Sequence, residues 1–148
     1  MFCAEVVDEI LSQIKQFRRN GPVSDFARKI KHLGRSRVLI PEEVLDGKQI
    51  YSIRSPDASF GHLKAHYPGM VIEVCHSKKS ARVPHLADEY ILNTDGNMKA
   101  VVAFNIYKGS KAATFTVWRP EYVVEDGVQV LQAAAAIKSQ VRLLPGQY

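Results

Sequence analysis

Two neighbouring stretches decide the fold of this chain: residues 50–60, IYSIRSPDASF, and residues 68–77, PGMVIEVCHS. Each has the short apolar pattern of a β-strand, and each carries one carboxylate. Asp57 follows a proline in the first stretch, and Glu73 interrupts the apolar run of the second. A charge inside a buried strand is costly unless it is paired or holds a metal. Because the two strands are expected to be neighbours, Asp57 and Glu73 can share one divalent cation.

The composition is that of one globular domain spanning residues 1–148, with 46% hydrophobic and 24% charged residues. No apolar run approaches the roughly 18 residues that a membrane helix needs. No basic region precedes an apolar stretch at the N-terminus, so we expect an intracellular protein, nuclear or cytoplasmic. Cys3 and Cys75 have no partners at zinc spacing, which favours a reducing compartment, and a single disulfide between them stays open as an alternative.

Positive charge is concentrated in one part of the chain. The formal net charge is +5, and residues 15–37 hold eight basic residues against one acid, Asp25. Such a cluster suits a polyanion, most often nucleic acid, although a solvated helix surface explains it equally well. We expect nucleic acid, and DNA in particular, to be bound by the following basic residues of this region: Arg18, Arg19, Arg28, Lys29, Lys31, Arg35 and Arg37.

The first helix is expected over residues 2–18, because its apolar side chains recur at helical spacing. They are Val6, Val7, Ile10, Ile14 and Phe17. At about 100° per residue, Glu9 falls at the margin of this stripe and Asp8 points away from it. Glu9 is therefore the acid of this helix best placed to lean toward a site in the core, with plain solvent exposure as the alternative.

Several shorter elements follow before the two acid-bearing strands. Ser24 or Asp25 can begin a second helix that continues to Gly34. Residues 37–40 are expected to be extended, residues 41–45 to form a turn or brief helix, and Asp46-Gly47 to form a turn.

The second half of the chain predicts one helix and several strands. A helix is expected from residue 82 or 84 to residue 92, a covered strand over residues 99–107, and its hairpin partner over residues 113–118. Asp126-Gly127 favours a further hairpin, which the alanine-rich residues 132–137 would continue as a helix. The fold class is therefore α/β or α+β, with a mixed central sheet flanked by helices.

Metal-dependent phosphodiester hydrolysis explains why acids and a lysine would be gathered here. Acids hold Mg²⁺, and a lysine two residues after a strand acid lies on the same face of the strand. In this chain Cys75 takes that position. Lys78 and Lys79 follow shortly after, and either side chain is long enough to reach back toward Glu73.

The order of these motifs resembles the PD-(D/E)xK nuclease superfamily, and it is closest to uncharacterised fungal members. The resemblance covers roughly residues 50–120 and rests on Pro56-Asp57, on residues 67–79 (YPGMVIEVCHSKK), on residues 86–91 (LADEYI) and on Val117-Trp118-Arg119. It implies a restriction-endonuclease-like core, Asp57 and Glu73 as ligands of Mg²⁺ or Mn²⁺, and Glu9 as an additional acid from the first helix. It also implies that Lys78 or Lys79 contacts the scissile phosphate.

Two functional hypotheses follow from this resemblance. The first is a metal-dependent nuclease that hydrolyses phosphodiester bonds in DNA, expected to act as a homodimer because one such site cuts one strand at a time. The second is an inactive module of the same fold that binds nucleic acid or a protein partner, since the lysine is missing from the Cys75 position and Lys78 stands where fungal members typically have glutamine. A plain interaction domain, with Glu73 in a structural ion pair, is the third alternative.

Overall fold

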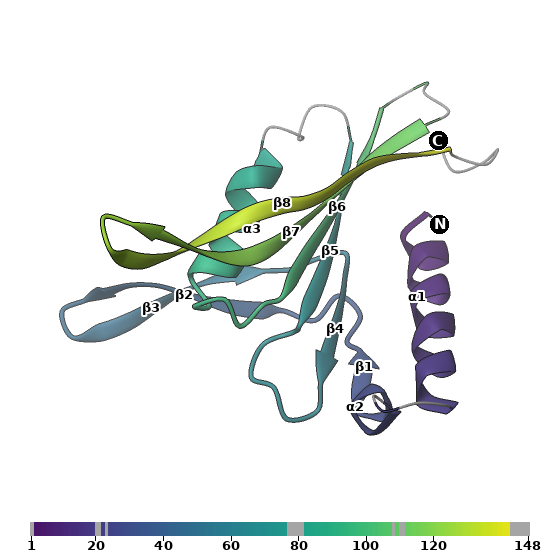
Figure 1. Ribbon diagram of the computed structural model, residues 1–148, viewed down its shortest axis with the longest axis horizontal. Helices are drawn as coiled ribbons and strands as arrows, with labels where there is room; N and C mark the ends of the chain where they lie inside the picture. Colours follow the sequence, from purple (N-terminus) through teal and green to yellow (C-terminus); the bar gives the residue numbers. More distant parts are fainter. Residues whose placement is uncertain are drawn as a thin grey trace.

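The computed structural model describes residues 2–19, 22, 24–76, 82–107, 109 and 112–142. Its main sheet has the strand order β1-β4-β5-β6-β7-β8 (Figure 1). These strands are β1 Ile30–His32, β4 Ala58–His62, β5 Met70–His76, β6 Ala100–Ile106, β7 Ala112–Glu125 and β8 Val128–Arg142. The β5–β6 pair is parallel and the other neighbours are antiparallel, so the sheet is mixed as the sequence predicts.

Helices cover both faces of the centre of this sheet. The helix α1, Phe2–Arg19, packs its Val7 side on Ile72 and Phe104, whereas α3, Val83–Leu92, packs on the opposite face around Val71. The short helix α2, Ser24–Arg28, leads into β1. Because β5 is covered on both sides, its apolar side chains are continuous rather than alternating.

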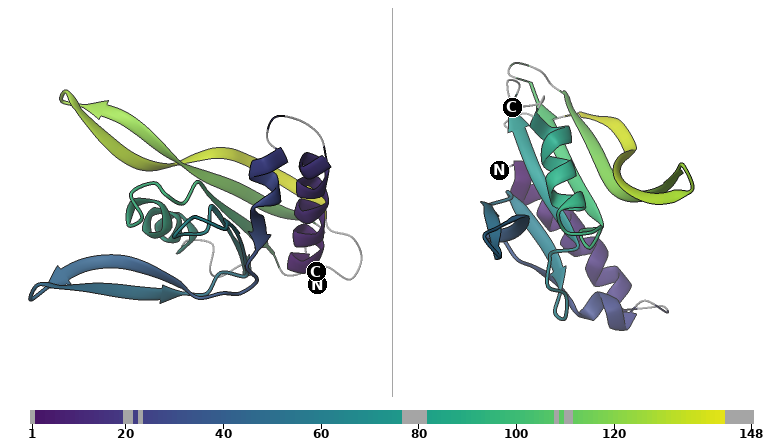
Figure 2. Two further views of the ribbon diagram at one scale, coloured as in Figure 1. Left: turned by 90° about the horizontal axis from the view of Figure 1, so that it is seen from below. Right: turned by 90° about the vertical axis from the view of Figure 1, so that its left-hand side faces the viewer.

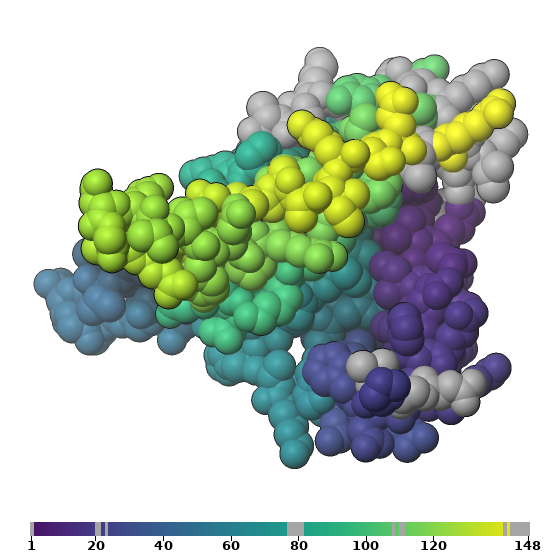
Figure 3. All heavy atoms as spheres, viewed as in Figure 1, coloured from purple at the N-terminus to yellow at the C-terminus, as the bar shows by residue number. Residues whose placement is uncertain are grey.

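A second sheet consists of one hairpin, β2 Val38–Leu45 with β3 Lys48–Arg54. This hairpin and the distal part of the β7–β8 hairpin project in the same direction beyond the body of the molecule (Figures 2 and 3). Both end in an Asp-Gly turn with positive φ at each residue, at Asp46-Gly47 and Asp126-Gly127. These backbone angles match the twist of an antiparallel pair, which confirms both predicted turns.

Three predictions for the first half of the chain are wrong. The second helix ends at Arg28, because Ile30–His32 instead pairs with β4. Residues 41–45 belong to β2, which continues past Pro41 through a β-bulge that accommodates the missing N–H. The stretch 50–60 is divided between β3 and β4 by residues 55–57, so that its two parts lie in different sheets.

The predicted helix in residues 132–137 is also wrong, because β8 extends without interruption from Val128 to Arg142. The alanines of this segment pair with β7 at Arg119 and Pro120, and Ala133 packs against the α3 core. Tertiary pairing overrides the helix propensity of alanine here. The helix at residues 2–18 and the helix ending at residue 92 are confirmed, and β5 and β6 confirm the strands predicted within residues 68–76 and 99–107.

Candidate active site

Asp57 lies directly before β4 and Glu73 lies within β5, the neighbouring strand. β4 and β5 are antiparallel, and their paired residues end with Ala58 opposite Ile72. Extending this register by one step would set Asp57 opposite Glu73. The Oδ2 atom of Asp57 accepts the Val74 backbone N–H at 2.7 Å. Residues opposite each other share a face of the sheet. Both acids accordingly line one cavity of about 500 Å³ between β5 and α3.

Glu73 is held by α3. Its Oε1 accepts a hydrogen bond of 2.9 Å from the hydroxyl of Tyr90, a fully buried residue. The pKa of Glu73 is raised to about 7, chiefly by burial and also by the negative charge of Asp57, against the opposing effects of the Tyr90 hydrogen bond and Arg54. Burial and the Glu73 charge in turn raise the pKa of Tyr90, so Tyr90 remains a donor. Glu73 is thus poised between its protonated and ionised forms near neutral pH.

Asp57 has a more polar environment. Its side chain is about one quarter exposed at 26%, and Oδ1 lies 3.5 Å from Nη2 of Arg35. With Oδ2 fixed by the Val74 N–H, the carboxylate is oriented by the backbone of the strand that carries Glu73.

The position two residues after Glu73 holds a buried cysteine. Cys75 packs with Val83 and Ala103 and lines the same cavity. Among the described residues, the cavity is lined by two arginines: Arg54 at the end of β3 and Arg82 directly before α3. These two arginines were not among the predicted site residues. In the sequence, Arg54 is marked only by its position three residues before Asp57. Arg82 is marked only by its position at the start of the predicted helix.

A network of side chains closes the α3 side of the cavity. Nε of Arg54 donates to Oε2 of Glu89 at 2.9 Å, and its Nη2 donates to the same oxygen. His85 lies one helical turn before Glu89, with Nε2 3.6 Å from Oε1. The end of β3 is thereby joined to α3 across the cavity.

The structure does not bring Glu9 together with Asp57 and Glu73. Glu9 is exposed, accepts a 3.0 Å hydrogen bond from Gln13, and lines a separate hollow on α1. The predicted stripe included Phe17, which is 53% exposed, and omitted Leu11, which packs on the core. Compared with the predicted stripe, the buried face of α1 is rotated toward Asp8. Asp8 and Asp57 both line a cavity of about 430 Å³.

The predicted basic residues have different positions. Arg18 is engaged within the fold, since its Nε donates to the Ala27 carbonyl at 3.0 Å and its Nη2 to the Ile30 carbonyl at 2.6 Å. Lys78 and Lys79 lie outside the described residues. The other six predicted residues are exposed: Arg19, Arg28, Lys29, Lys31, Arg35 and Arg37.

Two carboxylates on one cavity are oxygen ligands of the kind that a hard cation such as Mg²⁺ prefers. Within the described ranges, no group of three or more His, Cys, Asp and Glu side chains is arranged to hold a metal ion. Mg²⁺ commonly binds one or two carboxylates and completes its shell with water and substrate phosphates, so a pair of acids suffices.

No family model, curated protein or solved structure matches this chain. Among the described residues, no helix is long and apolar enough to cross a membrane.

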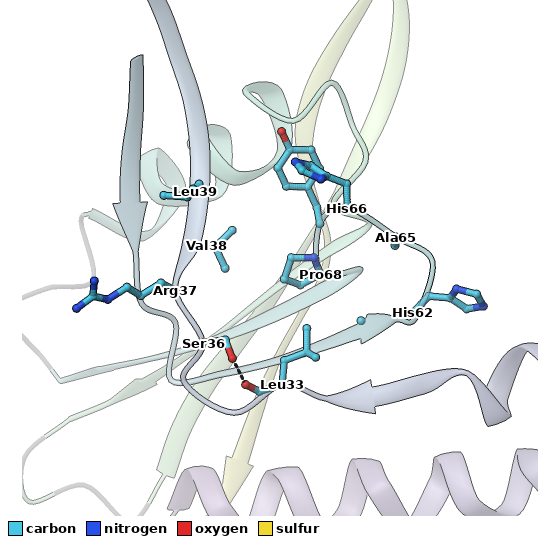
Figure 4. Close-up of a pocket in the computed structure, with 11 residues that line it drawn as sticks. Leu33, Ser36, Arg37, Val38, Leu39, His62, Ala65, His66 and Pro68 are labelled. Atoms are coloured by element: carbon cyan, nitrogen blue, oxygen red, sulfur yellow. Dashed lines mark hydrogen bonds between the residues drawn. The ribbon is translucent and has the colours of Figure 1, made fainter. Parts of the chain in front are cut away.

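Another cavity, of about 270 Å³, lies between the start of β2 and the loop that follows β4 (Figure 4). Arg37 points away from it, and the Ser36 hydroxyl is bonded to the Leu33 carbonyl. None of the described residues lining it is an acid. It therefore lacks the carboxylates that the cavity of Asp57 and Glu73 provides.

Proposed function

We propose that this chain is a metal-dependent nuclease-like domain that hydrolyses phosphodiester bonds in DNA. The observation that supports it is the cavity that Asp57, directly before β4, and Glu73, within β5, line together. The PD-(D/E)xK resemblance belongs to the same proposal. An antiparallel β4–β5 pair followed by α3 and a parallel β6 is the arrangement expected of a restriction-endonuclease-like core.

Asp57 and Glu73 would hold Mg²⁺ or Mn²⁺ through oxygens not already used in the fold. Among the described residues, Glu73 Oε2 accepts no hydrogen bond, and Asp57 Oδ1 has only the long contact to Arg35. A divalent cation held there supplies Lewis acidity toward a phosphate oxygen. Tyr90 and the Val74 N–H keep the two carboxylates in fixed orientations, which lowers the cost of assembling the site.

Cationic side chains are needed next to the acids because a phosphodiester is itself an anion. Arg82 is exposed at the rim of the cavity, and Arg54 is held on its wall by Glu89. We assign the phosphate contact to Arg82, which has no described ion pair to release, with Lys78 or Lys79 as the alternatives taken from the sequence.

The proposal is tested by cleavage of supercoiled plasmid with Mg²⁺ or Mn²⁺ by Asp57→Asn and Glu73→Gln. Each variant is expected to lose cleavage by a factor on the order of 100 or more, because both remove a negative charge that faces the cation. Glu9→Gln is the matched control, since Glu9 is an acid predicted for the site that the structure leaves on the surface. Unchanged cleavage by both cavity variants would remove these acids from the mechanism.

The second candidate function is a non-cleaving module that binds nucleic acid or a protein. It is favoured by Cys75, which packs on Val83 in the position where a lysine would face the phosphate. Titration calorimetry with Mg²⁺, compared between the wild type and Glu73→Gln, separates the two functions. Metal binding that disappears in the variant supports the nuclease, whereas DNA binding without metal binding supports the module.

A further inference from the structure

A groove of about 620 Å³ lies between α1 and the side of the main sheet formed by β1, β4 and β5. Its apolar lining comes from both helices and from the sheet: Ile10 and Ile14 of α1, Phe26 of α2, Phe60 of β4 and Met70 of β5. Phe60 belongs to the core, whereas Phe26 is 60% exposed, although phenylalanine is usually buried. Apolar surface left open in this way commonly marks a binding site.

The lysines of the groove come from two loops rather than from the helices. Lys64 lies in the loop that follows β4, and Asn97 and Lys99 lie in the loop that leads into β6. The Lys99 ammonium is held in place by the Gly96 carbonyl, which accepts its hydrogen bond at 2.6 Å. The described lining of the groove contains no carboxylate. The groove therefore combines an apolar body with a positively charged rim.

His62 connects the apolar part of the groove with the basic part. Its ring stacks on that of Phe26, with the centroids 5.0 Å apart and the planes inclined by 22°. Its Nδ1 accepts the Lys64 backbone N–H at 3.1 Å. Because these contacts fix the ring of His62, they also restrict the exposed ring of Phe26. An aromatic surface that is ordered before a ligand arrives lowers the entropic cost of binding.

From these observations we propose that the groove binds a small amphiphile with one anionic head and a hydrocarbon body, of the class of free single-chain fatty acids. Its volume lies within the range of roughly 300–1,000 Å³ that is typical of small-molecule sites. The head would meet Lys64 and Lys99, and the body would cover Phe26 and the isoleucines of α1. A polynucleotide carries charge along its whole length and would leave this apolar lining without a partner.

The groove and the cavity of Asp57 and Glu73 are separate sites. Successive residues of a strand point to opposite faces, so Met70 shares its face of β5 with Ile72 and not with Glu73. Ile72 packs in the α1 cluster, whereas Glu73 is bonded to Tyr90 of α3. Binding of the amphiphile therefore does not depend on the proposed nuclease function, and Glu73→Gln should bind it with the wild-type Kd.

Calorimetric titration with decanoate tests the proposal, with 1-decanol as the uncharged ligand of the same chain length. The wild type is expected to bind one equivalent of decanoate, and to bind 1-decanol about tenfold more weakly. Joint replacement of Lys64 and Lys99 by alanine should remove this preference, because it weakens decanoate binding and leaves 1-decanol binding unchanged. Lys138→Ala, an exposed lysine of β8, is the matched control and should retain the preference.

The apolar part of the groove is tested by Phe26→Ser. This variant should weaken the binding of both ligands by at least about tenfold, because the side chain covers the hydrocarbon chain in either complex. Phe17→Ser is the matched control, since Phe17 is 53% exposed near the end of α1 and is not among the residues that line the groove. Both phenylalanines are more than half exposed, so the far-UV circular dichroism spectrum should stay unchanged in either variant.

Sedimentation with phosphatidylglycerol vesicles distinguishes a free single-chain ligand from a membrane surface. The wild type should remain in the supernatant, and co-sedimentation that Phe26→Ser abolishes would overturn the proposal in favour of a membrane contact. Absence of saturable decanoate binding would also overturn it, as would equal affinity of the wild type for decanoate and 1-decanol. An equal loss of affinity in Phe17→Ser and Phe26→Ser would place the ligand outside the groove.

Discussion

Glu73 lies half-buried between β5 and α3, with its carboxylate bonded to the Tyr90 hydroxyl. A carboxylate in such a place pays a desolvation cost that one hydrogen bond only partly offsets, which is why its pKa rises to about 7. The buried Glu73 carboxylate next to Asp57 therefore lowers the stability of the fold. Residues arranged in this way are typical of functional sites, although structural networks also perturb pKa values.

The Glu73 pKa predicts how stability depends on pH in the metal-free protein. The carboxyl binds its proton more tightly when folded than when unfolded, where its pKa is near 4.5. The free energy of unfolding should therefore be highest below about pH 4.5 and fall as the pH rises through about 7, by roughly 1 to 3 kcal/mol for this group. Glu73→Gln should lack this fall and be more stable than the wild type at pH 8.

Urea unfolding in EDTA at pH 5 and pH 8 provides the measurement. Asp88→Asn, an exposed acid on α3, is the control and should follow the wild-type profile. A Glu73→Gln variant with the same loss of stability between the two pH values as the wild type would show that Glu73 titrates normally.

At the scale of single elements, one glycine turn and one partly buried arginine stabilise the ends of helices and strands. α3 is closed by Gly96, whose N–H donates to the Ile91 carbonyl at 2.8 Å with φ of +72°. α2 and β1 are joined by Arg18, which bonds a carbonyl of each segment's end. These contacts connect elements that the apolar pattern alone leaves independent.

Gly96→Ala should destabilise the protein more than Gly127→Ala does. Both glycines have positive φ, so an added Cβ costs about 1 kcal/mol of strain at either position. Only at Gly96 would the Cβ also meet neighbours, with the Tyr122 hydroxyl at 3.2 Å, whereas Gly127 has open space. Urea unfolding should show an additional loss of about 1 kcal/mol for Gly96→Ala. An equal loss of unfolding free energy in the two variants would mean that the β7–β8 hairpin moves away from the added Cβ at no energetic cost.

A comparison of Arg18→Ala with Arg19→Ala should distinguish a structural role of an arginine from the effect of losing a surface charge. Arg18→Ala leaves two carbonyls without their charged donor and should lower the free energy of unfolding by about 2 kcal/mol. Arg19 is exposed at the same helix end, so its replacement should change stability by less than about 0.5 kcal/mol. Thermal unfolding of the two variants side by side is the measurement, and a similar Tm for both would contradict the bonding role of Arg18.

At the scale of the whole molecule, charge and shape are distributed unevenly. Exposed basic residues gather on α2, β1 and the segment before β2, whereas the tips of both projecting hairpins are acidic. A polyanion would accordingly approach the body rather than the hairpins.

DNA binding, if the proposed function holds, should therefore depend on the body. Replacing Arg28, Lys29 and Lys31 with alanine should reduce the slope of log Kd against log salt by about 2 to 3, because each phosphate contact contributes roughly 0.9. Fluorescence anisotropy with a labelled duplex over a salt series measures this slope. The control variant replaces Lys48, Lys138 and Arg142. It removes the same charge from the β2–β3 hairpin and from β8, the edge of the main sheet opposite β1, and should leave the slope unchanged.

The sequence by itself determined the local elements and the presence of two unusual acids. Apolar periodicity is a property of a few successive residues, so it predicts α1, α3, β5 and β6 well, and Asp-Gly pairs predict the hairpin turns from backbone angles alone. The sixteen-residue interval from Asp57 to Glu73 indicated neighbouring strands, and the hairpin register agrees with it.

Tertiary structure alone decided which strands join and which side chains meet. The alanines of β8 became extended because β7 offered backbone partners, and residues 30–32 became a strand because β4 did. Packing on β4 and β5 decided which face of α1 lies against the core. As a result, Asp8 and not Glu9 shares a cavity with Asp57. Arg54 and Arg82 reached the cavity from distant segments, and no local pattern records such convergence because its energy comes from contacts far apart in the chain.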